Sequence, residues 1–281
     1  MKKACGLCLA LLMIYSSVAS AQSSMPTANI LTRVLMVQSQ YGRDSIFSID
    51  VDNREYWITA KHILTGAQHP PYGSITVPSV SLQMLDPGSP GEKWIPVLFS
   101  VIDTAKDVDI VVLAPREPLL KNPLPSEPSD TDGASLGGDC EFLGFPYGGG
   151  WRATIEGRSY WMPFVKHCTV SSIADSKAAT SATERVWILD GINNEGFSGG
   201  PVVFRTGPDQ KIMAVVSGYV TEPADVISSG ARKAVTKSSQ TTVQATWLKA
   251  NVNSGFIIAY DIHYVVDAIQ MHPIGALRNA R

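Results

Sequence analysis

The stretch of sequence that decides the fold is GFSGGP, residues 196–201, in the last third of the chain. A serine between glycines can present its hydroxyl while neighbouring backbone N–H groups remain free to bind an anion, which is the geometry of acyl transfer. On its own, such a run is more often a turn than a nucleophile. The role of Ser198 therefore depends on what accompanies it elsewhere in the chain.

Two upstream segments supply the partners that a nucleophilic serine needs. The segment TAKH ends one apolar run at His62, and Asp109 begins another, DIVVL. A serine hydroxyl barely ionises at neutral pH, so it needs a base within reach and a carboxylate that holds the base in the right tautomer. His62, Asp109 and Ser198 follow one another in that order, each at the edge of a strand-like segment. Asp107 is the alternative carboxylate, because it lies two residues from Asp109 and shares its face of an extended strand.

These three segments resemble those of the chymotrypsin/trypsin-like serine peptidases, and most closely the bacterial exported Deg-type proteases. The resemblance extends to the nucleophile loop, residues 190–198, and to residues 255–260, which match the last strand of those proteases. It implies that Ser198 attacks a peptide carbonyl, that His62 relays the proton and that Asp109 orients His62.

The resemblance also implies how the site is assembled. The backbone N–H groups of Gly196 and Ser198 are expected to form the oxyanion hole. Digestive relatives carry an acid just before the serine, which pairs with a newly cut N-terminal ammonium; this chain has Phe197 there, so we expect no activation by that ion pair. Deg-type proteases usually continue into a peptide-binding PDZ domain, which we do not expect because only nine residues follow His272.

Substrate-binding residues follow from the same resemblance. Ser217, Gly218 and Tyr219 match the strand that pairs with the substrate backbone, although Ser217 also fits an ordinary strand residue. Ile192 falls at the floor of the primary specificity pocket, so we expect a small or apolar residue before the cleaved bond. A shift of the loop by one residue would bring Asp190 to that place instead.

The distribution of apolar runs favours an all-β fold. The runs are short and are punctuated by 23 glycines and 18 prolines. Together with the resemblance, they predict two six-stranded antiparallel β-barrels of the chymotrypsin type with a C-terminal helix. Strands of the first barrel are expected at 30–38, 47–51, 55–59, 79–85, 94–102 and 110–114. Those of the second are expected at 139–143, 164–173, 186–189, 201–205, 212–219 and 255–260, and helical spacing predicts a closing helix at 261–271.

The domain organisation follows from the same patterns. A basic start, a short apolar stretch and the small residues before Gln22 predict a secretory signal peptide. We expect residues 22–29 to be a frayed start and the insertions 148–162 and 221–254, the second with Arg232, Lys233 and Lys237, to be surface loops. The expected division is signal peptide 1–21, N-terminal barrel 22–115, proline-rich linker 116–138, C-terminal barrel and helix 139–272, and tail 273–281.

Charge and composition exclude several classes of protein. The chain has 23 lysine and arginine residues against 25 aspartate and glutamate residues, and loss of Lys2 and Lys3 with the signal peptide leaves 21 against 25. No basic stripe indicates nucleic-acid binding. After signal cleavage no stretch reaches the roughly 20 apolar residues of a membrane anchor. We therefore expect an exported protein, periplasmic or extracellular, that acts on polypeptides and needs no cofactor; its oligomeric state is left open.

Two cysteines, Cys140 and Cys168, remain once Cys5 and Cys8 leave with the signal peptide. They lie on segments that we expect to pair as neighbouring strands, so a disulfide is expected in an oxidising compartment. Two buried free thiols are the alternative. Metal binding is not expected, since no Cys-x-x-Cys or histidine cluster accompanies them.

Two other functions remain open from the sequence. GFSGG also satisfies G-x-S-x-G, the nucleophile elbow of α/β-hydrolases, but that fold needs a helix after Ser198, and residues 201–204 have the pattern of a strand. A protease-fold binding module without turnover is the alternative from a different class. The favoured hypothesis is an exported serine endopeptidase with its active site between two barrels.

Overall fold

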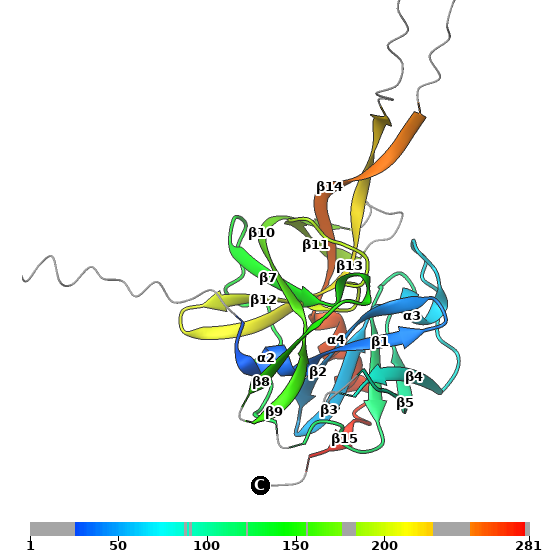
Figure 1. Cartoon of the computed structure of the whole chain (residues 1–281), viewed down its shortest axis with the longest axis vertical. Coiled ribbons are helices and arrows are strands. Elements are labelled where there is room, and N and C mark those ends of the chain that lie inside the picture. Colours follow the sequence, from blue (N-terminus) through cyan, green and yellow to red (C-terminus); the bar gives the residue numbers. More distant parts are fainter. Residues whose placement is uncertain are drawn as a thin grey trace, which may run out of the picture.

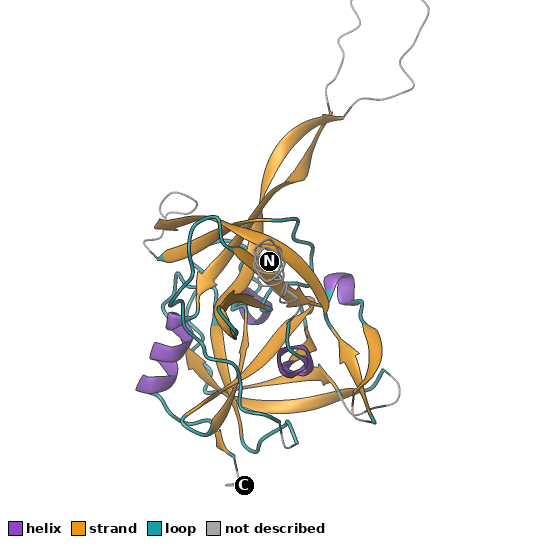
Figure 2. Cartoon of the chain, turned by 90° about the vertical axis from the view of Figure 1, so that its left-hand side faces the viewer, coloured by secondary structure: helices purple, strands orange, loops and turns teal. Residues whose placement is uncertain are grey.

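The computed structural model describes residues 26–86, 89, 92–121, 123–155, 157–175, 184–226 and 248–278. The expected signal peptide lies outside this part of the chain. Strands make up most of the described residues and the helices are short (Figure 2). None of the described helices is long and apolar enough to cross a membrane.

The first barrel is closed by six strands of the described chain. They are β1 (Val34–Ser39), β2 (Gly42–Val51), β3 (Arg54–Thr59), β4 (Ser79–Leu85), β5 (Trp94–Asp103) and β6 (Val111–Pro115). Neighbours run in the order β3, β2, β1, β4, β5, β6, and β6 pairs back onto β3. The β2–β3 turn is made by Asp52 and Asn53, both with positive φ, as a two-residue hairpin turn requires. β15 (Ala276–Leu277) pairs with Arg54 and Glu55 at the start of β3.

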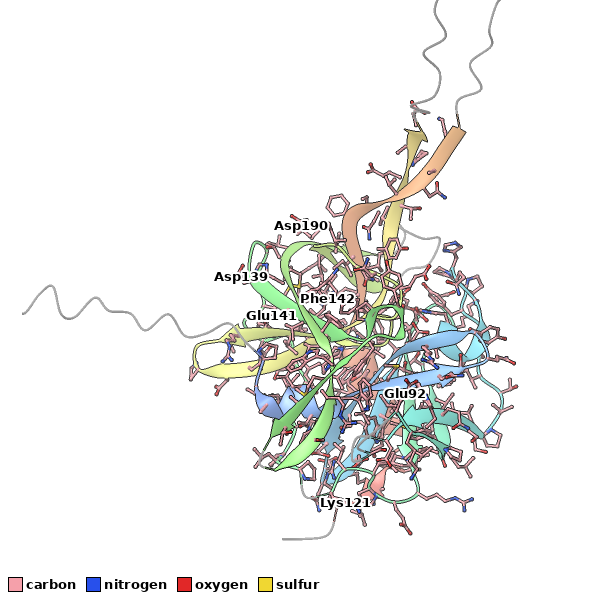
Figure 3. All side chains as sticks on the ribbon, viewed as in Figure 1. Glu92, Lys121, Asp139, Glu141, Phe142 and Asp190 are labelled. Carbon is pink, nitrogen blue, oxygen red and sulfur yellow. A yellow bond between two sulfur atoms is a disulfide. The ribbon has the colours of Figure 1, made fainter. Side chains whose placement is uncertain are left out.

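The second barrel is also closed, by six further strands of the described chain. They are β7 (Asp139–Gly144), β10 (Phe164–Asp175), β11 (Arg185–Asp190), β12 (Pro201–Thr206), β13 (Asp209–Val226) and β14 (Leu248–Asp261). β7, which carries the labelled residues Asp139, Glu141 and Phe142 in Figure 3, pairs with β10 and β12. Cys140 and Cys168 are directly opposite on β7 and β10 and form a disulfide, with their Cα atoms 4.9 Å apart. The predicted architecture of two antiparallel barrels is confirmed.

The chain enters the first barrel through a helix where the sequence predicted part of a strand. α2 (Ala28–Arg33) occupies the start of the expected 30–38 strand, and the strand itself begins only at Val34. The side chain of Thr27 accepts a hydrogen bond from the N–H of Ile30, which caps the helix. Ile30 and Arg33 are both buried and lie three residues apart, the spacing of one helix face. The cap at Thr27 therefore favours a helix over residues 28–33, where the apolar run had predicted the start of a strand.

Both insertions contain strands rather than irregular loops. β8 (Trp151–Ile155) and β9 (Arg158–Met162) form a hairpin within the first insertion. In the second, β13 and β14 continue as a paired ribbon from Thr221–Asn253 to Val226–Leu248, which projects from the barrel in Figure 1. Residues 248–253 of the ribbon, LKANVN, alternate between apolar and polar types as a strand does, although the insertion as a whole is long and polar. The basic residues expected in that loop, Arg232, Lys233 and Lys237, lie outside the described residues.

Each barrel has a cluster of buried apolar residues of its own, and a third cluster spans both barrels. Its buried residues include Phe47 and Ile58 of the first barrel and Leu143 and Val215 of the second. α4 (His263–Met271), which begins two residues later than predicted, packs Val265, Ala268 and Ile269 against the same core. The apolar contact between the barrels fixes their relative position, and with it the site at their junction.

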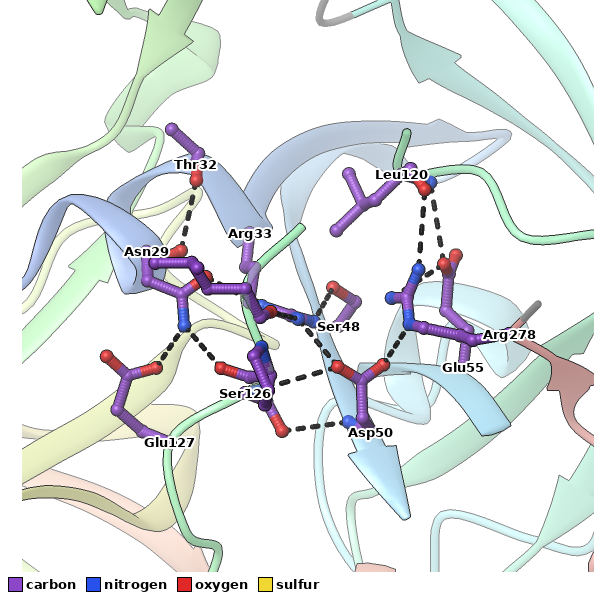
Figure 4. A network of polar contacts seen from close by, with 12 residues as sticks. Asn29, Thr32, Arg33, Ser48, Asp50, Glu55, Leu120, Ser126, Glu127 and Arg278 are labelled. Atoms are coloured by element: carbon purple, nitrogen blue, oxygen red, sulfur yellow. Dashed lines mark hydrogen bonds and ion pairs between the residues drawn. The ribbon is translucent and has the colours of Figure 1, made fainter. Parts of the chain in front are cut away.

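A buried ionic network lies beside the β2–β3 turn of the first barrel (Figure 4). Asp50 of β2 pairs with Arg33 at 2.6 Å and with Arg278 at 2.6 Å, while Arg278 also pairs with Glu55 at 2.8 Å. Asp50 further accepts the backbone N–H of Ser126, in the segment that joins the barrels. The network therefore ties α2, the connecting segment and the C-terminal segment to β2 and β3.

Candidate active site

A histidine and an aspartate at neighbouring strand ends of the first barrel meet directly, since Thr59 at the end of β3 pairs with Val111 at the start of β6. α3 (His62–Thr65) follows β3, and Asp109 precedes β6. The backbone N–H of His62 donates to Oδ1 of Asp109 at 2.8 Å, and Nδ1 of His62 lies 2.6 Å from Oδ2. The Asp109 side chain is fully buried. Because Nδ1 faces the carboxylate, Nε2 is left as the basic nitrogen of the neutral ring. Asp109, and not Asp107, is thus the carboxylate that contacts His62.

A buried lysine holds the two segments in place. Lys61, the residue before His62, has a fully buried side chain whose Nζ lies 2.8 Å from the carboxylate of Asp103. Nζ also donates to the carbonyl oxygens of Thr104 and Ala105, at 3.2 and 2.9 Å. These residues lead into the Asp109 segment. Sequence reasoning missed Lys61, whose position next to the histidine was its only signal.

Ser217 of β13 connects the histidine–aspartate pair to the second barrel. Its Oγ donates to Oδ2 of Asp109 at 2.5 Å, and its carbonyl oxygen accepts a hydrogen bond from Oγ of Ser198 at 3.0 Å. Among the described residues, no hydrogen bond joins Ser198 directly to His62. The structure therefore brings His62, Asp109, Ser217 and Ser198 together, with Ser217 as the bridge.

The peptide before Gly196 is oriented by its neighbours. The carbonyl oxygen of Glu195 accepts the N–H of Tyr147 at 2.8 Å. Because C=O and N–H of a trans peptide point in opposite directions, the N–H of Gly196 points away from Tyr147. Within the described part of the chain, neither this N–H nor that of Ser198 has a hydrogen-bond acceptor. Two backbone donors are thus available beside the serine hydroxyl.

Gly196 has a conformation and surroundings that require glycine. Its φ is +96°, and a Cβ at this position would lie 2.3 Å from the carbonyl oxygen of Phe145. The carbonyl oxygen of Gly196 accepts a hydrogen bond from Oγ of Ser45 at 2.6 Å. Ser45 lies in β2 of the first barrel, and its N–H donates to the carbonyl oxygen of Ser198 at 3.0 Å. The first barrel thus holds the backbone on both sides of Phe197.

Phe197 anchors the loop in the second barrel. Its side chain is fully buried, and its ring meets the edge of Phe142 with centroids 4.9 Å apart. Because the sequence has no acid at this position, no activating ion pair was expected. In the structure Phe197 is a buried aromatic residue that anchors the loop.

The predicted substrate strand has an open edge beside the serine. β12 pairs with β13 only as far as Val215, so beyond Val216 this edge of β13 has no strand partner among the described residues. Ser217, Gly218 and Tyr219 lie on that stretch. The side chain of Ile192, predicted at the pocket floor, is 63% exposed.

Two acidic side chains set the charge around His62. Burial alone opposes protonation of His62, but the charge of Asp109, the hydrogen bond to it and the charge of Asp44 together raise the pKa of the imidazole above its ordinary value. Burial raises the pKa of Asp44 to about 6, and the nearby charges of Asp109 and Glu195 act in the same direction. The side chain of Asp44 has no hydrogen-bond partner among the described residues. It gave no signal in the sequence.

Comparisons with known proteins bear on this arrangement. No family model and no curated protein sequence matches the chain. The HtrA-type protease AlgW with tripeptide matches its structure with a TM-score of 0.53 at 15% identity, over 89% of this chain and 64% of that chain. The active form of the Rv3671c protease from M. tuberculosis matches with a TM-score of 0.50 at 16% identity, over 90% and 86%. The chain has the fold of the trypsin-like serine proteases. At these identities, the likeness to HtrA-type proteases establishes the fold and leaves the chemistry to the residues themselves.

Proposed function

We propose that the chain is an exported serine endopeptidase that hydrolyses peptide bonds through an acyl-enzyme intermediate. The proposal is carried by one continuous set of hydrogen bonds, from His62 through Asp109 and Ser217 to Ser198. Two backbone N–H groups that have no acceptor within the described residues lie beside the hydroxyl at its end. A nucleophile, an oriented base and anion-binding donors are what acyl transfer requires.

The reaction follows from these positions. Oγ of Ser198 bonds to the substrate carbonyl carbon while its proton passes to Nε2 of His62, and the N–H groups of Gly196 and Ser198 stabilise the oxyanion by about 3 kcal/mol per donor. His62 then gives the proton to the leaving amine as the C–N bond breaks. Water attacks the acyl-enzyme in the same way and releases the acid. Asp109 supports the positive charge of the imidazolium.

The hydroxyl of Ser198 must turn before it attacks. It donates to the carbonyl oxygen of Ser217, and rotation about its Cα–Cβ bond to another staggered position directs it to His62. The same hydrogen bond favours the second candidate, a protease-fold binding module in which Ser198 stays on Ser217 and no turnover occurs.

The substrate is a polypeptide in extended form. Its backbone would pair with the open edge of β13 at residues 217–219, and the neighbour AlgW is known with a tripeptide and with a decapeptide. The family pattern assigns Ile192, which is 63% exposed here, to the primary pocket, and on that basis small or apolar side chains are preferred before the cleaved bond. A peptide-library cleavage profile measures this preference, and a dominant preference for lysine or arginine would contradict it.

Export is supported by the disulfide between Cys140 and Cys168, which is stable in oxidising compartments. The mature protein would begin at Gln22 after signal cleavage. N-terminal sequencing of the protein from the periplasm or the culture medium tests this, and a retained Met1 in a cytoplasmic fraction would contradict it.

A fluorophosphonate probe separates the two candidate functions. The endopeptidase is labelled at Ser198 and cleaves casein, whereas the binding module is folded but neither labelled nor active. Ser198→Ala abolishes labelling and lowers hydrolysis by several orders of magnitude, and His62→Ala does the same through loss of the base. Ser79→Ala, which changes an exposed serine on β4, is the matched control and keeps full activity.

A further inference from the structure

A lysine of the second barrel reaches the nucleophile loop from outside the set of residues described above as the reaction machinery. Lys166 lies on β10, opposite Phe142 of β7. Its Nζ donates to the carbonyl oxygen of Ile192 at 2.6 Å and to Oδ1 of Asn194 at 2.5 Å. The same ammonium lies 5.5 Å from the centre of the Phe197 ring. One cation thus contacts three residues of the loop that leads to Ser198.

The contacts of Lys166 continue to the peptide that orients Gly196. Nδ2 of Asn194, whose Oδ1 is held by Lys166, donates to the hydroxyl of Tyr147 at 3.1 Å. The backbone N–H of Tyr147 in turn binds the carbonyl oxygen of Glu195 at 2.8 Å. Lys166 and Tyr147 therefore hold the two residues before Gly196 from opposite ends.

The loop depends on such side-chain contacts. The carbonyl oxygen of Asn193 is held by Nδ2 of Asn253 at 2.6 Å, and Nδ2 of Asn193 binds the carbonyl oxygen of Gly218 at 3.3 Å. From Ile192 to Asn194, no backbone–backbone hydrogen bond within the described chain is donated by the loop. Removal of one of these side chains thus leaves this stretch without an equivalent backbone restraint.

Lys166 forms no ion pair with any described carboxylate. Burial alone lowers the pKa of its ammonium, and the charge is met by a carbonyl oxygen, an amide oxygen and the face of an aromatic ring. Hydrogen bonds from a charged donor are stronger and more directional than neutral ones. An ammonium used in this way is committed to the loop, because no salt bridge competes for it.

We propose that Lys166 is a positioning residue that holds the nucleophile loop in the conformation with the N–H of Gly196 available to the oxyanion. The proposal rests on the proposed protease function and adds a built-in anchor for its oxyanion hole. When the anchor is removed, Ile192 and Asn194 lose their charged hydrogen-bond donor, and the Glu195–Gly196 peptide, which keeps only its contact with the N–H of Tyr147, rotates more readily. The donor for the oxyanion is then lost while His62, Asp109 and Ser198 remain in place.

Lys166→Met tests the proposal, since it keeps the apolar stem and removes the ammonium. We expect kcat to fall by about tenfold or more, with KM changed by about twofold at most, because the oxyanion exists only in the transition state. Lys166→Arg restores part of the lost kcat. Lys211→Met is the matched control, because Lys211 of β13 pairs with Asp130 at 2.6 Å away from the loop, and it keeps wild-type kcat.

Asn194→Ala provides a second variant that leaves the lysine in place. It lowers kcat in the same way, and the double variant Lys166→Met/Asn194→Ala is no worse than the more damaged single variant, because both act through one contact. Unchanged kcat in Lys166→Met, or an equal loss in Lys211→Met together with a lower Tm, would overturn the proposal.

Hydrogen exchange gives a readout that does not need catalysis. The amides of residues 191–198 exchange faster in Lys166→Met than in wild type or Lys211→Met if the anchor holds the loop. Equal exchange in all three proteins contradicts the anchor even if the wild type proves inactive. An inactive and unlabelled wild type with the expected exchange difference contradicts the protease function alone.

Discussion

The two barrels contribute to the candidate site in different ways. The first barrel delivers His62 and Asp109 as a finished pair, joined by two direct hydrogen bonds with Lys61 buried behind them. The second delivers Ser198 on a loop whose conformation depends on two glycines with positive φ, Gly196 and Gly199, and on side chains from other segments. The proposed base is therefore preassembled by strand positions, whereas the proposed oxyanion donors depend on how a loop is held.

Each barrel also sends one serine into the other half of the site. Ser45 of the first barrel holds the carbonyl oxygens of Gly196 and Ser198. Ser217 of the second barrel donates to the carboxylate of Asp109. This reciprocity means that a small shift between the barrels changes both the base and the nucleophile, and it explains why the shared core matters for function.

The largest effect is expected when the His62–Asp109 pair of the first barrel is disrupted. Asp109→Asn keeps the shape of the side chain but favours the wrong tautomer of His62, so kcat should fall by about four orders of magnitude with little change in Tm. Steady-state hydrolysis of a peptide substrate measures it. Asp107→Asn is the control, and a larger loss in that variant would reverse the assignment of the carboxylate.

The difference between the barrels also explains what the sequence could predict. His62, Asp109 and Ser198 each lie in a short local pattern, and the pairing of Cys140 with Cys168 follows from neighbouring strands. Ser45 and Lys166 have no such pattern, because their roles exist only as contacts with the nucleophile loop. Residues that lie in a recognisable local motif can be predicted from the sequence. Residues that act only through contacts with a distant segment cannot.

Secondary structure shows the same division. The barrel strands were predictable from buried apolar runs. The start of α2 was not, because the Thr27 cap competes with an apolar run that suits a strand equally well. The β13–β14 ribbon was missed because the insertion is long and polar as a whole, although residues 248–253, LKANVN, carry the alternation of a strand.

The second prediction breaks the loop of the second barrel. Gly196→Ala places a Cβ 2.3 Å from the carbonyl oxygen of Phe145 and strains a φ of +96°, so the loop must shift. Loss of one oxyanion donor lowers kcat by about 10²- to 10³-fold. Gly207→Ala is the matched control: it has φ of +62° but no atom within 4 Å of the new Cβ. Similar kinetics in the two variants would show that strain alone, rather than the oxyanion donor, causes the loss.

A smaller effect is expected where the barrels exchange serines. Ser217→Ala removes the hydroxyl that donates to Asp109 but keeps the carbonyl oxygen that accepts from Ser198. The charged carboxylate loses one of its hydrogen bonds, and we expect kcat to fall by about tenfold. Ser254→Ala, which removes a hydroxyl bound to the carbonyl oxygen of Val220, is the control on the neighbouring strand. No change in Ser217→Ala would mean that backbone contacts alone align the barrels.

The smallest expected effect concerns the pKa of His62 in the His62–Asp109 pair of the first barrel. His62 acts as a base only when neutral, and its raised pKa means that activity begins to fall at a higher pH than an ordinary histidine would impose. Asp44, with its pKa raised to about 6, is largely ionised at neutral pH and contributes to this elevation. Asp44→Asn removes that negative charge, lowers the pKa of His62 and moves the acid limb of kcat/KM to lower pH.

The expected displacement is a few tenths of a pH unit, as suits a charge that shares a partly solvated site. It is measured from the kcat/KM profile between pH 5 and 8, with Asp209→Asn, an exposed change at the far turn of the second barrel, as the control. A midpoint that stays fixed or moves upward would mean that Asp109 alone sets the protonation of His62. A downward shift would show that the charge of Asp44 raises the pKa of His62 without direct contact and so helps to set the pH range of activity.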